Sequence, residues 1–300
     1  MALSHDPLWP RAGSWPAFDG AADAVLLGVP AWRTSLSPTG AHATPAAVRD
    51  ALSRYSATLM GPPVVELDSV LRIADAGDVA DPDTADGVEA VVARVRELAP
   101  AFVIALGGDN SVTYAAARGA GATGLITFDA HFDLRDGVSN GSPVRRLVED
   151  APLSERIDPR RIVQIGIADF ANSAAYAARA AAWGIRVIAL DELRRRGIDD
   201  VVAEAVEIAG GGGEARIHLD VDVDVADRSV APGCPASLPG GLQAWELRAL
   251  TRAVAADHRV VSADLVEVDA AADAADHRTV RLTALCVLEL LAGLASRRRS

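Results

Sequence analysis

Short apolar runs alternate with longer, helix-like segments along the whole chain. The runs have the length and continuous hydrophobicity of strands that are buried on both faces. We expect strands at residues 24–29, 70–74, 101–106, 124–128, 161–167, 185–190, 215–222 and 259–268. We expect helices between them, at residues 45–60, 86–98, 111–118, 173–183, 199–208, 244–255 and 279–294.

This alternation predicts an α/β fold with a mainly parallel sheet that is covered by helices on both faces. No internal repeat is evident, and we expect residues 1–300 to form a single domain. Two long irregular segments, 136–143 and 226–241, each follow a cluster of aspartates, so we expect both to be functional. The glycine run 210–213 is interpreted as a plain connector.

The composition excludes several classes of function. The chain has 29 basic and 41 acidic side chains and a net charge of -12, which argues against nucleic acid or an acidic membrane as partner. It contains no lysine, which excludes Schiff-base chemistry. The two cysteines, Cys234 and Cys286, cannot build a disulfide framework or a thiolate zinc site, and they favour a reducing compartment.

The sequence also predicts a cytoplasmic protein. Residues 1–10 lack the basic start and apolar run of a signal peptide. The apolar stretch 284–295 is interrupted by Glu289 and is too short to span a bilayer.

Charged side chains cluster where two of the predicted strands end. The residues are Asp129, His131 and Asp133 after one strand, and Asp220, Asp222 and Asp224 at the end of another. Their spacing of two places each set on one side of an extended chain. Carboxylates this crowded, on strands too apolar for the surface, would repel one another unless a cation is bound.

Two further strands are followed by residues 107–111 and by Glu267, so four strand ends carry polar side chains. Ligands of open parallel sheets bind at the carboxyl ends of the strands. Oxygen ligands with one imidazole and no sulfur favour manganese or magnesium over structural zinc. We infer two ions bridged by shared aspartates. Taken singly, residues 129–133 could form a polar network and residues 107–110 an ordinary turn; together with the second acidic cluster they favour metal.

Four segments resemble the ureohydrolase family, which includes arginase, agmatinase and formimidoylglutamase. They are residues 107–111, 128–133, 222–233 and 264–268, in the order typical of the family. The resemblance implies a three-layer αβα sandwich like that of arginase, with a dimanganese centre that activates a hydroxide. By position it assigns one Mn²⁺ to Asn110, Asp129, Asp133 and Asp222 and the other to Asp129, His131, Asp222 and Asp224.

Two positions leave alternatives open. Asn110 stands where many relatives have histidine, so one ion either has a weaker neutral ligand or loses that contact. Asp220 and Asp222 could be the ligand pair in place of Asp222 and Asp224, although the spacing from Asp224 to residues 231–233 matches the family. Arg228 replaces a common proline, which we expect to alter only the loop.

The segment 134–146 resembles formimidoylglutamases more than arginases, which usually have asparagine at the position of Arg135 and a histidine in the following loop. The resemblance implies hydrolysis of N-formimidoyl-L-glutamate to L-glutamate and formamide, in histidine degradation. Guanidinium groups suit the two carboxylates of this amidine. The expected substrate-binding residues are Arg135, Ser139, Asn140, Ser142 and Arg145. Arg145 and Arg146 could instead simply decorate a helix.

The resemblance further implies that Glu267 pairs with the amidinium group and that Asp133 carries a proton to the leaving amine. It also implies a homo-oligomer, trimeric or hexameric. Two other functions stay open. The protein could be another ureohydrolase, such as an agmatinase, an arginase or a guanidino-acid hydrolase that releases urea. It could also be a metal-poor paralogue that binds a ligand without catalysis.

Overall fold

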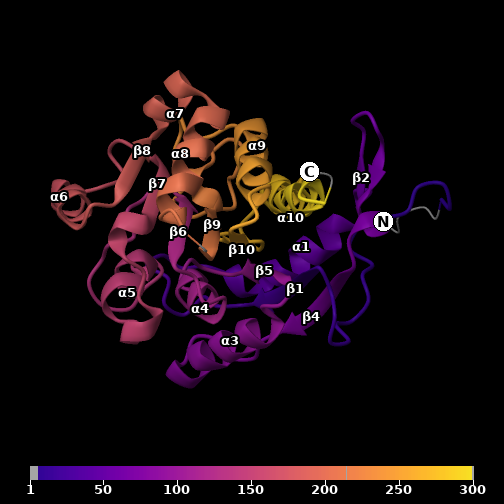
Figure 1. Cartoon of the computed structure of the whole chain (residues 1–300), viewed down its shortest axis with the longest axis horizontal. Coiled ribbons are helices and arrows are strands. Elements are labelled where there is room, and N and C mark those ends of the chain that lie inside the picture. Colours follow the sequence, from indigo (N-terminus) through magenta and orange to yellow (C-terminus); the bar gives the residue numbers. More distant parts are fainter. Residues whose placement is uncertain (1–5, 214, 299–300) are drawn as a thin grey trace.

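An eight-stranded sheet lies at the centre of the computed structural model, which describes residues 6–213 and 215–298 (Figure 1). The strands are β1 (Ala24–Val29), β4 (Ile73–Asp78), β5 (Phe102–Gly107), β6 (Gly124–Phe128), β7 (Ile162–Ile167), β8 (Arg186–Ala189), β9 (Ile217–Asp222) and β10 (Val260–Val266). Their order in the sheet is β4-β1-β5-β10-β9-β6-β7-β8, and every pairing in it is parallel. A separate antiparallel hairpin joins β2 (Thr58–Leu59) to β3 (Val65–Glu66).

Helices cover both faces of the sheet. They are α1 (Thr44–Leu52), α2 (Leu67–Val70), α3 (Ala85–Leu98), α4 (Val112–Gly119), α5 (Pro143–Glu149), α6 (Ala174–Trp183), α7 (Leu190–Arg196), α8 (Ile198–Gly210), α9 (Ala244–Ala255) and α10 (Arg278–Ser296). Buried side chains of α1, α7, α8, α9 and α10 share one apolar cluster with the sheet. Those of α3, α4, α5 and α6 form two clusters with it. The expected three-layer αβα sandwich is confirmed.

Two of the expected elements were wrong in extent. The helix expected at residues 45–60 ends at Leu52, because its buried face, including Val48, Ala51 and Leu52, stops there and the chain continues into the β2–β3 hairpin. The strand expected at residues 70–74 begins only at Ile73, since Val70 closes the short helix α2.

Besides the short helix α2, two helices were not expected. Helix α5 begins at Pro143, a residue suited to the first helical turn because it has no N–H to satisfy there. Helix α7 carries acidic residues in its first turn and three arginines in its last, the charge order that the helix dipole favours. Both are short, with seven residues each, and lie beside segments that were read as loop or strand.

Helix α10 is the only described helix that is long and apolar enough to cross a membrane, judged by length and composition. In the structure 72% of its apolar window is buried, and it packs against α9 and α1 (Figure 1). Its Glu289 accepts hydrogen bonds from Arg248 and Arg252 of α9, at 2.9 and 2.5 Å. It is therefore a helix of the core. Residues 1–5, in the segment examined for a signal peptide, lie outside the described residues.

The sheet order brings the acidic segments together. Strands β5, β10, β9 and β6 are neighbours at the centre of the sheet and run in the same direction. Their carboxyl ends therefore meet at one edge, as the sequence predicted for residues 107–111, Glu267 and the two aspartate clusters.

Candidate active site

The candidate active site is built on the ends of β6 and β9. Asp129 follows β6 directly and is fully buried. Asp222 ends β9 and accepts a 2.8 Å hydrogen bond from the backbone N–H of Asp224, which turns the chain and brings the second carboxylate to the site. Asp222 and Asp224 are both 2% exposed.

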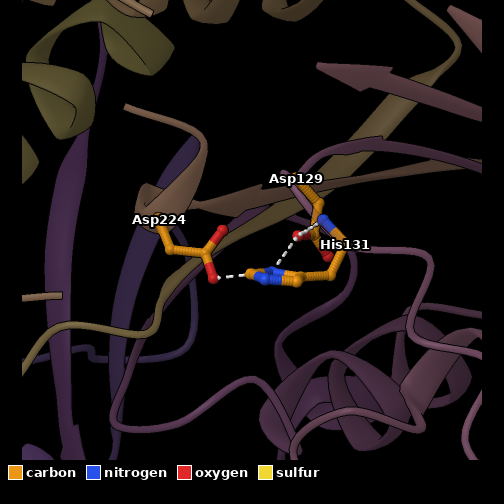
Figure 2. Close-up of side chains that lie close together, drawn as sticks. All are labelled: Asp129, His131 and Asp224. Carbon is orange, nitrogen blue, oxygen red and sulfur yellow. Dashed lines mark hydrogen bonds and ion pairs between the residues drawn. The ribbon is translucent and has the colours of Figure 1, made fainter. Parts of the chain in front are cut away.

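These side chains form two groups with the geometry of metal sites. Asp129, His131 and Asp224 form one group, shown in Figure 2, and Asp129, Asp133 and Asp222 form the other. Within each group the potential ligand atoms lie within 4.8 Å of one another. The groups share Asp129, which is the arrangement that two ions bridged by a common carboxylate require.

His131 points between two carboxylates (Figure 2). Its Nδ1 lies 3.0 Å from Asp224 Oδ2 and 3.4 Å from Asp129 Oδ1. Burial alone would lower the pKa of His131, but these carboxylates outweigh it and raise the pKa to about 12. The imidazole is thus held in a strongly negative environment.

The aspartates also have raised pKa values, but here burial is the main cause and the neighbouring carboxylates add to it. Burial, and then the nearby Asp224 carboxylate, raise the pKa of Asp129 to about 6. Burial, with Asp129 next, raises the pKa of Asp133 well above its usual value, and burial with Asp224 does the same for Asp222. Asp129 Oδ2 is buried and accepts no hydrogen bond from the described residues. The potential ligands are carboxylate oxygens and one imidazole nitrogen, and one buried oxygen has no partner among the described residues. This combination fits divalent cations.

Asn110 faces the second group through its amide nitrogen. Nδ2 donates to Asp133 Oδ2 at 2.7 Å and to Asp222 Oδ2 at 3.0 Å, while Oδ1 accepts from the Thr113 hydroxyl at 2.6 Å. In this orientation Asn110 is a hydrogen-bond donor to two of the expected ligands. Ligation of an ion by Oδ1 would require the amide to turn and lose the Thr113 contact.

Asp220 lies within β9, two residues before Asp222. It is fully buried, stands opposite Asp264 of β10 in the sheet register, and belongs to neither metal-like group among the described residues. The groups contain Asp222 and Asp224, the register that the family spacing favours. His218, also fully buried, contacts Ser262 Oγ at 2.8 Å and Asp264 Oδ2 at 3.1 Å, away from both groups.

Glu267 stands at the end of β10 with a left-handed backbone, at φ 61°. Its Oε1 accepts hydrogen bonds from the backbone N–H of Asn110 at 2.8 Å and from Asn140 Nδ2 at 2.7 Å. Burial and the Asp109 carboxylate raise the pKa of Glu267 to about 8. A cationic group beside it would favour its charged form.

A cavity of about 290 Å³ opens over these side chains. Its lining includes the buried Asp133, Asp222, Asp224 and Glu267, the half-buried His131, Asn140 and Tyr176, and the exposed Leu36 and Arg135. The cavity is large enough for a small organic substrate and brings that substrate next to both carboxylate groups.

The expected substrate residues fall into two sets. Arg135 and Asn140 line the cavity, and the guanidinium of Arg135 forms no ion pair with the described residues. Ser142 Oγ instead donates to Ser139 O at 2.7 Å and accepts from Ser139 N at 2.9 Å, so these two serines shape the loop.

The structure does not bring Arg145 to the cavity. Its guanidinium donates to Arg135 O at 2.8 Å, to Gly137 O at 2.7 Å and to both carboxylate oxygens of Asp150. Its side chain supports the segment that carries Arg135, which differs from the expected contact with substrate. Arg145 lies on helix α5 (Pro143–Glu149), which agrees with the alternative that placed Arg145 and Arg146 on a helix.

Sequence reasoning missed the loop at residues 32–40, of which Ser35, Leu36 and Ser37 line the cavity. The loop follows β1, so the rule that ligands bind at carboxyl ends of strands could have indicated it. Sequence reasoning also missed Asn172, whose side chain accepts from Phe132 N at 3.0 Å and donates to Ala130 O at 2.8 Å. Asn172 thereby fixes the backbone between the β6 ligands.

Comparison with known proteins identifies the family. The sequence model of the arginase family matches residues 22–293. The chain belongs to the arginase family. The resemblance to ureohydrolases that four segments carried is confirmed.

Within the arginase family, the chain is 36% identical to the formimidoylglutamase of Bacillus subtilis (strain 168), over 90% of this chain and 86% of that protein. It is 33% identical to the guanidinopropionase of Pseudomonas aeruginosa, over 93% of this chain and 90% of that protein. Members of the family with different substrates are thus similar to this chain.

Solved arginase-family structures are also similar. The structure of the B. subtilis formimidoylglutamase has a TM-score of 0.88 at 31% identity and covers 98% of this chain and 94% of that one. A Trypanosoma cruzi formiminoglutamase with Mn²⁺₂ has a TM-score of 0.85 at 26% identity, covering 96% and 99%. That enzyme has also been solved as a variant with an asparagine replaced by histidine, again with Mn²⁺₂.

Proposed function

We propose that the protein is a formimidoylglutamase, a hydrolase that converts N-formimidoyl-L-glutamate and water to L-glutamate and formamide. One observation carries the proposal: a single cavity is lined both by the exposed Arg135, whose guanidinium forms no ion pair with the described residues, and by the buried Glu267 carboxylate beside the acid groups. The substrate has complementary groups, with carboxylates at one end and a cationic amidine at the other. Several formimidoylglutamases among the relatives support this choice.

Glu267 is suited to bind the amidinium group. Its Oε1 is occupied by two N–H donors, while Oε2 accepts no hydrogen bond from the described residues and is left for the N–H groups of the substrate. The pKa of about 8 for Glu267 means that an incoming cation would complete its ionisation. Arg135 holds the glutamate end through a planar donor fork that matches carboxylate geometry.

We assign a pair of Mn²⁺ ions to the two acid groups, held by Asp129, His131, Asp133, Asp222 and Asp224, with Asn110 alongside. When bound, such a pair supplies Lewis-acid activation of water near neutral pH. Asp133 lines the cavity and belongs to one acid group, which suits it to carry the proton that the departing amine takes up.

We further propose that the protein acts in the cytoplasm, in histidine degradation, as a trimeric or hexameric homo-oligomer. Support for a homo-oligomer comes from exposed apolar side chains on the surface, among them Met60, Val64 and Trp245. Their burial between copies of the chain would remove apolar area from water.

Product identification tests the proposal. The protein loaded with Mn²⁺ is incubated with N-formimidoyl-L-glutamate, and formamide and glutamate are measured; both should appear in equal amounts. Parallel incubations use 3-guanidinopropionate, agmatine and arginine, with urea as the readout. Faster release of urea from a guanidino compound would assign the protein to another ureohydrolase activity. No turnover of any amidine, with manganese bound, would leave the binding-only alternative.

A further inference from the structure

Asn140, expected from sequence to bind substrate, uses its whole amide inside the protein. Nδ2 donates to Glu267 Oε1 at 2.7 Å, and Oδ1 accepts from the backbone N–H of Leu36 at 3.0 Å. The backbone N–H of Asn140 also donates to Thr34 O, at 3.3 Å. One side chain therefore connects the catalytic carboxylate to the loop at the mouth of the cavity.

Glu267 depends on such support. Its left-handed backbone conformation, at φ 61°, is one that non-glycine residues seldom adopt. The side chain is fixed at Oε1 by Asn140 and by the backbone N–H of Asn110, two donors from different segments. Loss of either donor leaves Oε1 with one hydrogen bond and loosens the orientation of the carboxylate.

We propose that Asn140 is a positioning residue for Glu267 and not a receptor for the glutamate end of the substrate. This inference rests on the proposed role of Glu267 in binding an amidinium group. By holding Oε1, Asn140 presents Oε2 to the substrate in one orientation. An error of about 1 Å in the position of a reacting group costs on the order of 100-fold in rate.

The chemistry of the position favours an amide. The contact with Glu267 needs a donor and the contact with Leu36 needs an acceptor, and asparagine carries both on one amide group. Aspartate has nearly the same shape but is an acceptor only when ionised. The N140D variant therefore keeps the Leu36 contact and removes the Glu267 contact.

Two variants of Asn140 test the proposal, with kcat and inhibition by L-glutamate as separate readouts. N140A and N140D are both expected to lower kcat by roughly 10- to 100-fold. Inhibition by L-glutamate, which has no amidinium group, should change less than about twofold in N140A, since only Arg135 is assigned to that end. R135Q is the comparison variant and should weaken L-glutamate inhibition by more than about tenfold, which N140A should not.

Two results would overturn the proposal. One is an N140D enzyme with the kcat of the unmodified protein. The other is an N140A enzyme with unchanged kcat and weakened L-glutamate inhibition, which would make Asn140 a direct receptor.

A wrong assignment of the proposed function can be told apart from a wrong role for Asn140. If the unmodified protein releases urea from a guanidino compound, the same variants are compared on that substrate, because a guanidinium would meet Glu267 in the same way. If no amidine is hydrolysed, formamidinium chloride serves as the probe in thermal unfolding. It should raise the midpoint of the unmodified protein and not that of N140A. An equal rise in both would contradict the role of Asn140.

Discussion

Asp129 shows how one residue determines the electrostatics of the site. It belongs to both acid groups and is fully buried. Without a cation, the aspartates around it favour protonation, and the pKa values of Asp129 and Glu267 rise to about 6 and about 8. The effect of pH on thermal stability should therefore differ between the metal-free and the metal-loaded protein.

The first prediction concerns that response. A carboxyl whose folded pKa is raised stabilises the fold below its unfolded pKa of about 4, and the contribution is lost as pH rises through the folded pKa. For Asp129 and Glu267 the loss extends through about pH 6 and about pH 8. Chelated protein should therefore melt at lower temperature at about pH 8 than at about pH 5, and Mn²⁺ should raise the midpoint more at the higher pH. A Mn²⁺ effect independent of pH would contradict this.

Glu267 should act on substrate and not on metal. E267Q removes the charge that pairs with the amidinium and should lower kcat/KM by about 100- to 1000-fold. Manganese per chain, measured by elemental analysis, should stay unchanged, because Glu267 is in neither acid group. E97Q, at an exposed helix position, is the matched control and should retain full activity. Loss of metal in E267Q would mean that Glu267 is a ligand.

Asn110 should limit the affinity of one metal position. Imidazole is a stronger ligand than a neutral amide for divalent transition metals, so N110H should bind its second Mn²⁺ more tightly, by roughly tenfold. Titration with Mn²⁺, followed by the free-ion signal in electron paramagnetic resonance, measures both affinities. An unchanged second affinity would show that this position lies outside the coordination sphere.

The sequence identified the residues of the site better than their contacts. Asp129, His131 and Asp222 could be placed because strand ends and a spacing of two determine which way they point. Arg145 could not, because nothing local shows that Asp150 and two carbonyls would occupy its guanidinium. Asn140 was placed at the site, but its bond to Glu267 spans 127 positions in the chain.

At the scale of elements, the loop at residues 32–40 is held in place by carboxylates from three separate segments. Asp83 accepts from the backbone N–H groups of Trp32 and Arg33, both at 2.8 Å. Asp109 accepts from the Ser35 hydroxyl at 3.0 Å, and Asp269 accepts from Gly40 N at 2.7 Å. The outer wall of the cavity is thus tied to β5 and β10 and does not behave as a free loop.

Loosening this loop should affect substrate binding. Asp269 is 5% exposed and also accepts from Ala271 N and Ala272 N, so D269A leaves several N–H groups unpaired. We expect a loss of about 1–3 kcal/mol in the free energy of unfolding and a raised KM with a smaller change in kcat. D50A is the control, because Asp50 is exposed on α1 and its side chain forms no hydrogen bond or ion pair with the described residues. Denaturant unfolding and steady-state kinetics measure both effects; an unchanged KM would separate the loop from the substrate.

Elements with a clear apolar pattern were predictable. Strand β6 and helix α9 have the bounds expected from their apolar runs. The β2–β3 hairpin was not, because its strands have two residues each and form a sheet of their own. A helix read through residues 45–60 had enough apolar residues to look continuous, and only pairing with Val65–Glu66 gives the last part another structure.

For the whole molecule, one continuous eight-stranded parallel sheet favours a single cooperative folding unit. We therefore expect thermal unfolding of the chain in one transition. The homo-oligomer proposed above should have three or six times the 31.1 kDa mass of the chain in light scattering. Since Met60 and Val64 lie at the β2–β3 hairpin and are exposed, M60S/V64S should lower that mass if the hairpin is in the interface. A monomer would contradict the proposal.

Asn140 is followed by Gly141, the pairing in which the next backbone nitrogen most readily attacks the asparagine amide carbon and releases ammonia; water then opens the resulting succinimide to aspartate or isoaspartate. The bonds to Glu267 and Leu36 restrain the amide and slow this ageing reaction. Stored enzyme should still accumulate deamidated, poorly active molecules that remain fully folded, and partial unfolding of the protein should speed their formation.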